Sequence, residues 1–199
     1  MNQMKKNILW MLAFSLMVTA LSACSNDDDK TEAKAEVTMM YYVKVTDDVL
    51  KVADVEVNYV DVTGAQKKEV LTSAEWKKAV KSTKLPLTEG IWAKITPKAP
   101  IADGNYQLQV TTVAGYQAKL ANGKTVTYGY GSAPDEVPTP AQTSDNVAAW
   151  CAKSPTVAFT ISTEGDAKAS KVDFGGNSSD NTDYRLAAWL YEQWMRLFG

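Results

Sequence analysis

The stretch YQAKLANGKTVTYGY, residues 116–130, decides the fold of this chain. In it, Asn122-Gly123 stands between two segments, Tyr116–Leu120 and Lys124–Tyr130. An Asn-Gly pair in this position is the strongest short-range signal for a β-hairpin, because both residues accept the positive φ angles of a tight turn. We therefore predict two antiparallel strands that are joined at Asn122-Gly123.

The first half of the chain shows the same kind of pattern. In residues 41–46 and 54–61, β-branched and aromatic side chains recur with period 2, which favours strands. Thr63-Gly64-Ala65 is expected to turn the chain into a further strand at residues 67–71, which completes a second hairpin.

The segment 72–82 has two interpretations. Thr72-Ser73-Ala74-Glu75 fits a capping box, which would start a helix at Ser73. Residues 76–81, however, alternate in character with period 2, and Pro86 follows soon after. The alternation favours a strand, although both interpretations stay open at this point.

The second half of the chain adds further strands and one short helix. Residues 145–153 are expected to be helical, with Ser144 as the N-cap and Pro155 just beyond the end. We expect the last strand to pair with the one before it across Gly165. Strands are expected at residues 91–96, 106–110, 156–162 and 170–174.

Short strands at regular spacing, with one short helix, predict a mostly β protein with an antiparallel β-sandwich over residues 37–174. Two runs also resemble small Bacteroidota-type surface lipoproteins of unassigned function: Asp54-Val55-Glu56-Val57-Asn58-Tyr59 through Gly64, and Glu69-Val70-Leu71-Thr72 through Trp76 to Leu85-Pro86. The resemblance implies an Ig-like sandwich with one short helix before the last strands, and it brings no catalytic residues. The cysteine pair of Ig domains is absent.

The N-terminus has the features of a lipoprotein signal peptide over residues 1–23. Lys5 and Lys6 precede an apolar run, Ile8 to Leu21, that is short for a membrane span. Leu21-Ser22-Ala23-Cys24 resembles the lipobox of bacterial lipoproteins, which implies cleavage before Cys24 and acylation of that cysteine. Two or more acyl chains hold a protein stably on a membrane.

An acidic stretch follows the expected acylated cysteine. Ser25, Asn26, Asp27, Asp28 and Asp29 resemble the export signal that sends Bacteroidota-type lipoproteins to the outer leaflet of the outer membrane. The same residues also read as a solvated tether, residues 24–36, because they are polar and show no apolar periodicity. The two interpretations are compatible. The export signal predicts an outer-membrane protein that faces the cell surface, and a periplasm-facing position is the alternative.

The C-terminus departs from the sandwich pattern. A linker at residues 175–182 precedes residues 183–199, which are expected to form an amphipathic helix. Its apolar stripes are too extensive to remain in water. Its own sandwich, a partner or dimer interface, or the membrane surface are the three candidates for covering it. The stripes contain Leu186, Leu190, Trp194 and Leu197, and Ala187, Tyr191, Met195 and Phe198.

The composition argues against several classes of function. The chain contains no histidine, so catalytic triads and histidine metal sites are excluded. A net charge of −2 without a basic patch does not fit nucleic-acid binding. We therefore expect no enzyme, no cofactor, no metal and no nucleic-acid partner. Cys151 lies in an apolar stretch and is expected to be a buried thiol, because reactive thiols need a neighbouring cation or histidine.

Aromatic residues are the remaining functional lead. Trp92, Tyr116, Tyr128 and Tyr130 fall on strands or strand ends, where exposed rings could form a platform for a glycan. Core packing is the other interpretation of the same residues. The sequence thus predicts a surface module that binds or adheres to a glycan or a host protein. A structural or accessory subunit of an envelope assembly is the alternative.

The lipobox gives the first testable prediction. Replacing Cys24 with alanine should leave the protein unprocessed or soluble, because the acylated sulfur is lost. Intact-mass measurement of the parent protein, extracted from membranes, should give a chain that starts at residue 24 and carries acyl mass. A mature parent chain that starts elsewhere and carries no lipid would contradict the prediction.

Overall fold

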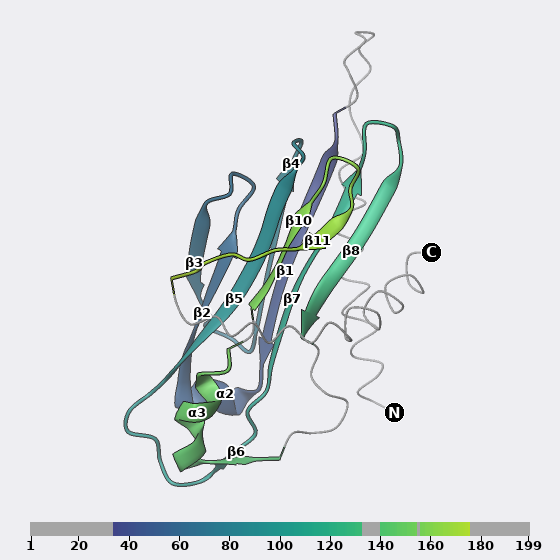
Figure 1. Cartoon of the computed structure of the whole chain (residues 1–199). Coiled ribbons are helices and arrows are strands. Elements are labelled where there is room, and N and C mark those ends of the chain that lie inside the picture. The colour runs from purple at the N-terminus through teal and green to yellow at the C-terminus, as the bar shows by residue number, and fades with distance from the viewer. Residues whose placement is uncertain (1–33, 133–139, 155, 176–199) are drawn as a thin grey trace, which may run out of the picture. The chain divides into compact units, whose positions relative to one another are not determined.

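The computed structural model describes residues 34–132, 140–154 and 156–175, and these residues are mostly in antiparallel strands (Figure 1). One sheet has the order β4-β1-β7-β8, and the other has the order β11-β10-β5-β2-β3. The four-stranded sheet contains β1 (Glu36–Val45), β4 (Glu75–Ser82), β7 (Val110–Lys119) and β8 (Thr125–Ser132). The five-stranded sheet contains β2 (Ala53–Val60), β3 (Gln66–Val70), β5 (Leu87–Pro97), β10 (Thr156–Ile161) and β11 (Ala167–Ala169).

The smaller elements gather at one end of the sheets, which we name the helical end (Figure 1). It contains α2 (Asp47–Val52), the 3-10 turn η1 (Ser144–Asn146), α3 (Val147–Cys151), and the ladder of β6 (Asn105–Tyr106) with β9 (Gln142–Thr143). The opposite end is where β1 begins. It carries the turns at residues 61–65, 83–86, 121–124 and 162–166, and we name it the hairpin end.

The two sheets stack face to face as in a β-sandwich. Strict alternation along the strands sends one set of side chains inward, as in β10, where Val157, Phe159 and Ile161 are buried. These side chains join the inward ones of β1 and β7 in one continuous cluster of buried apolar residues. The mostly β prediction is therefore confirmed, and the core lies between the sheets.

A buried carboxyl group crosses the core between the two sheets. Glu89, on β5, is 0% exposed, and its Oε1 accepts a hydrogen bond of 3.0 Å from the backbone N–H of Gly115 on β7. Burial raises the pKa of Glu89 well above the ordinary value of 4.5, which favours the protonated form. The close packing requires glycine at position 115, since a Cβ there would lie 2.8 Å from the carbonyl oxygen of Tyr128.

Residues 170–174 run over the outer face of the five-stranded sheet, and we name them the crossing segment (Figure 1). Phe174 packs on Trp92 with ring centroids 6.3 Å apart, and the Gln66 side chain on β3 donates a hydrogen bond of 2.5 Å to the carbonyl of Asp173. The predicted pairing of residues 170–174 with residues 156–162 holds only for Ser170, whose N–H donates a hydrogen bond of 3.1 Å to the carbonyl of Ala158. The regular ladder is formed by Ala167–Ala169, and the rest of the crossing segment leaves it.

Several sequence predictions are confirmed at the level of single elements. The hairpin at Asn122-Gly123 joins β7 to β8, with Gly123 at a φ of 83°. Residues 75–82 are a strand that pairs with β1, so the helical interpretation of this segment is wrong. The expected short helix is present as η1 followed by α3, although no side-chain cap from Ser144 is formed.

Two local features differ from the sequence prediction. Residues 47–52 form α2, which the strand pattern on either side concealed. Residues 106–110 were expected as one strand, but only β6 and the start of β7 are regular. Four further predictions lie outside the described residues. They are the signal peptide, acylation of Cys24, the export signal of residues 25–29 and the C-terminal helix of residues 183–199.

Glu89 gives a prediction about the pH dependence of stability. Its pKa is raised in the folded state, so the unfolded chain loses its proton first as the pH increases. The free energy of unfolding should therefore fall above about pH 4.5, by up to about 1.4 kcal/mol per pH unit, until the pH reaches the raised folded pKa. The Glu89→Gln variant is neutral at every pH and should lack this contribution.

Denaturant unfolding of the parent and of Glu89→Gln across this pH range will test the prediction. The difference between the two curves isolates Glu89, because all other titrating groups are shared. Glu89→Ala serves as a control that should be less stable at every pH, since it leaves a cavity and an unpaired Gly115 N–H. A difference between parent and Glu89→Gln that does not change with pH would contradict the prediction.

Candidate functional site

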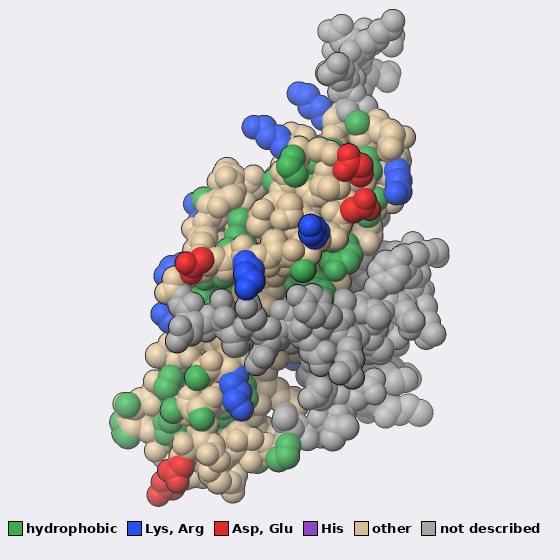
Figure 2. Space-filling view, in the orientation of Figure 1, with side chains coloured by type: hydrophobic (Ala, Val, Ile, Leu, Met, Phe, Trp, Pro, Cys, Tyr) green, Lys and Arg blue, Asp and Glu red, His purple; other side chains and the backbone are tan. Residues whose placement is uncertain are grey.

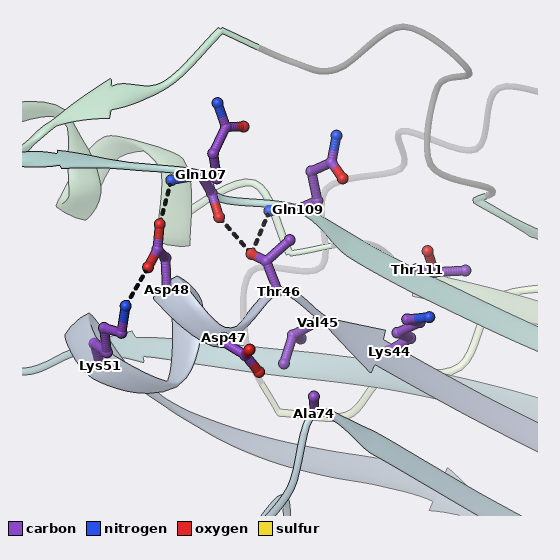
Figure 3. A pocket seen from close by; sticks show the side chains of 10 residues that line it. All are labelled: Lys44, Val45, Thr46, Asp47, Asp48, Lys51, Ala74, Gln107, Gln109 and Thr111. Atoms are coloured by element: carbon purple, nitrogen blue, oxygen red, sulfur yellow. Dashed lines mark hydrogen bonds and ion pairs between the residues drawn. The ribbon is translucent and has the colours of Figure 1, made fainter. Parts of the chain in front are cut away.

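An open recess of about 520 Å³ lies at the helical end, and Figure 3 shows its lining. Its size is within the range of small-ligand sites. The side chains come from the end of β1, the start of α2, the turn before β4, and the segment that leads into β7. The lining residues are Lys44, Val45, Thr46, Asp47, Asp48, Lys51, Ala74, Gln107, Gln109 and Thr111.

Asp48 fixes α2 against the opposite wall of the recess. Its Oδ2 accepts a hydrogen bond of 2.8 Å from the backbone N–H of Gln107, and its Oδ1 lies 2.7 Å from Nζ of Lys51 (Figure 3). The Lys51 contact, together with the Gln107 N–H, lowers the pKa of Asp48, which therefore remains charged. The acidic first turn and the Lys51 in the last turn also suit the dipole of a short helix.

Thr46 completes the same wall from the residue before α2. Its hydroxyl donates to the carbonyl of Gln107 and accepts a hydrogen bond of 3.2 Å from the backbone N–H of Gln109. The Thr46 N–H donates in turn to the carbonyl of Gln109, at 3.2 Å. These bonds explain why residues 107–109 leave the regular ladder, since side chains of another element satisfy their backbone groups.

Most of the side chains at the recess are polar, beside the apolar Val45 and Ala74. Gln107 and Gln109 stand on the same side of their segment (Figure 3). Nζ of Lys44 lies 3.2 Å from a carboxylate oxygen of Glu75. Amide groups, ammonium groups and the Asp47 carboxylate therefore offer both donors and acceptors. Among the described residues, no aromatic ring lines the recess, so its described side chains can contact a polar molecule by hydrogen bonds but not by stacking.

The aromatic platform predicted from the sequence is not present. Tyr116 is 0% exposed, Tyr130 is 6% exposed, and Tyr128 packs on Phe159 at 5.3 Å between ring centroids. Trp92 is on the outer face of β5 but is 6% exposed, because Phe174 of the crossing segment packs against it. The prediction is wrong because alternation along β7 and β8 directs the tyrosines into the core.

A second polar cluster, which the sequence did not indicate, joins β3 to β4 at the edge of the sandwich. Oε1 of Glu69 accepts hydrogen bonds from Tyr59 at 3.0 Å and from Lys78 at 2.6 Å, while Oε2 accepts one from the Trp76 indole at 2.9 Å. The contacts with Lys78, Trp76 and Tyr59 lower the pKa of Glu69, with Lys78 first. These hydrogen bonds join Glu69 on the five-stranded sheet to Trp76 and Lys78 on the four-stranded sheet, so the cluster links the two sheets.

The described residues contain no candidate metal centre. No group of three or more histidine, cysteine, aspartate or glutamate side chains that could hold a metal ion is found among them. Within the same residues, no helix has both the length and the apolar character needed to cross a membrane. Cys151 is buried at 2% exposure and forms no disulfide, which confirms the prediction of a buried thiol.

No protein-family model matches the chain, and no similar curated protein and no similar solved structure were found. The function must therefore be inferred from the residues themselves. Sequence reasoning did not select the recess. Its signals were present, however, in the Asp47-Asp48 start and Lys51 end of a short helix, and in Gln107 and Gln109 on one side of an alternating segment.

The buried thiol gives a prediction about reactivity. Burial raises the pKa of Cys151 to about 11, so both the low access and the small thiolate fraction slow its reaction. Native protein should resist iodoacetamide near neutral pH, whereas denatured protein should react at the rate of a free thiol. Mass measurement after timed alkylation checks this, and rapid labelling of the folded protein is the opposing result.

Proposed function

We propose that this protein is a non-catalytic binding module on the surface of a bacterial outer membrane, anchored by lipid on Cys24, with the helical-end recess as its ligand site. The observation that carries the proposal is the construction of that recess. Thr46 and Asp48 use their side chains to hold the opposite wall in place, and polar side chains are left lining the cavity.

The proposal includes an Ig-like sandwich as the scaffold. Four- and five-stranded antiparallel sheets around one core support it, as does a short helix that precedes β10. In such domains the loops at one end of a rigid sandwich commonly carry the binding residues. The recess has this location, since it is formed where β1 passes into α2.

The lining selects for a neutral or zwitterionic polar ligand, and a saccharide is the ligand class that we propose. Amides, ammonium groups and carboxylates in one cavity can match the hydroxyl groups of a sugar as donors and acceptors. The lining carries two aspartates and two lysines, so it has no net positive charge that would attract a nucleic-acid phosphate. The absence of histidine from the chain supports binding without catalysis.

Gln107→Ala tests the ligand site directly. This substitution removes a side-chain amide at the recess but keeps the backbone groups that bond to Asp48 and Thr46. Screening of the parent protein on a glycan array should identify a binder, and Gln107→Ala should bind it roughly three- to tenfold more weakly, as expected for one lost hydrogen bond.

Gln142→Ala is the matched control, because that side chain bonds to the carbonyl of Pro140 and does not line the recess. The control should bind the selected glycan with the affinity of the parent. Equal affinity of the parent and Gln107→Ala would place the glycan elsewhere. A parent that binds no glycan on the array would contradict the proposed ligand class.

A further inference from the structure

The lysines that lack an ion pair are concentrated at the hairpin end. The paired lysines lie mostly elsewhere, as in Lys44 with Glu75, Lys51 with Asp48 and Lys98 with Asp54. Within the described residues, the hairpin-end lysines without an ion pair are Lys34, Lys81, Lys84, Lys119, Lys124 and Lys168. All six are exposed, so their ammonium groups are free to meet a charged surface.

The strand register explains why these lysines meet at one end. Ser82 pairs with Val37, so the end of β4 lies beside the start of β1. Lys119 pairs with Glu36 and with Thr125, which brings the β7–β8 hairpin to the same place. Figure 2 shows lysine side chains projecting at this end, in the upper part of the view, together with acidic ones.

Carboxylates at the hairpin end are fewer. With Lys67 included, seven lysines face four carboxylates, which leaves an excess of three positive charges in a chain of net charge −2. Asp61 is bound by Lys67 and by the N–H groups of Thr63 and Ala65. The four carboxylates at this end are Glu36, Asp61, Glu164 and Asp166.

The helical end has the opposite balance. Six carboxylates there face four lysines, an excess of two negative charges. The charge of the sandwich is therefore separated along its strands, with the positive end where the chain enters β1. The charged residues of the helical end are Asp47, Asp48, Asp54, Glu75, Asp103 and Asp145, with Lys44, Lys51, Lys98 and Lys153.

We propose that the hairpin end lies against an anionic membrane surface and binds lipid phosphate groups through these lysines. This inference rests on the proposed anchor at Cys24, because residues 24–33 can span at most about 35 Å and so keep the hairpin end near the bilayer. Each lysine near an anionic surface favours association by on the order of fivefold. The sandwich then stands with its recess facing away from the membrane.

The acidic residues of the tether are the competing partner for the lysines. Asp27, Asp28 and Asp29 are consecutive, so they could meet only lysines that lie close together. The six lysines are instead spread over the ends of both sheets, since Lys81 and Lys119 lie on β4 and β7 of the four-stranded sheet and Lys168 lies on β11 at the edge of the five-stranded sheet. A broad distribution over the whole end fits a flat, charged surface better than a short peptide.

Two single-cysteine labels in the membrane-extracted, acylated protein test the orientation. Ala121→Cys places a fluorophore at the hairpin end and Ala102→Cys places one at the helical end, while the buried Cys151 remains unlabelled. The protein is reconstituted into phosphatidylcholine vesicles with or without phosphatidylglycerol and with headgroup-quencher lipids. The label at residue 121 should be quenched in anionic vesicles only, and high salt should abolish the quenching.

Charge variants identify the lysines responsible. Changing Lys81, Lys84, Lys119 and Lys124 together to glutamine should remove the quenching at residue 121. The matched control changes Lys68, Lys94, Lys98 and Lys153 to glutamine, which alters the net charge equally and should leave the quenching as in the parent. Equal quenching in neutral and anionic vesicles, quenching that survives the first variant, or equal quenching at residue 102 would overturn the proposal.

Flotation separates this inference from the anchor. Co-flotation of the parent with neutral vesicles reports the lipid anchor alone. If the parent does not float with neutral vesicles, the anchor is contradicted, and flotation with anionic vesicles then decides the present inference. Binding to anionic vesicles that the four-lysine variant loses supports it, and no binding to them overturns it.

Discussion

The hydrogen bond between the Gly115 N–H and the buried carboxyl of Glu89 sets how the two sheets face each other. Glu89 occupies an inward position on β5 and reaches the backbone of β7, so the bond can form only at one relative position of the sheets. Two tyrosines act in the same sense. Tyr41 donates to the carbonyl of Val60 at 2.5 Å, and Tyr116 donates to the carbonyl of Gly165 at 2.5 Å. A core without a disulfide thus obtains its alignment from polar groups placed among apolar ones.

The five-stranded sheet is covered on both faces over β5, and this coverage restricts which residues β5 can carry. A Cβ at Gly90 would lie 3.1 Å from the Val172 side chain and 3.4 Å from the Phe174 ring, so the crossing segment would have to move to admit one. On the outer face of β5, position 92 therefore carries an apolar side chain and position 90 carries the smallest residue. The edges are protected differently: Lys67 and Lys68 on β3 oppose association with another strand, as lysines on edge strands commonly do.

Sequence periodicity was sufficient to predict most of the strands but insufficient to predict the recess. β2, β10 and the β7–β8 hairpin follow from alternation and an Asn-Gly turn, since both depend on neighbouring residues only. The ladder partner of residues 159–161 and the burial of Trp92 depend on where residues 170–174 pass, which is a tertiary property. The recess was missed for the same reason. Asp48 and Gln107 are 59 positions apart, and their bond decides whether residues 107–109 remain a strand.

The path of β1 has a mechanical consequence. This strand begins at Glu36 on the hairpin end and leads directly into Thr46 at the recess, and it lies between β4 and β7 along its length. A tensile load applied between the start of β1 and the helical end therefore acts parallel to β1. Because antiparallel hydrogen bonds are perpendicular to the strands, such a load shears many bonds at once and does not open them one after another. The sandwich should therefore resist unfolding when it is pulled between its two ends.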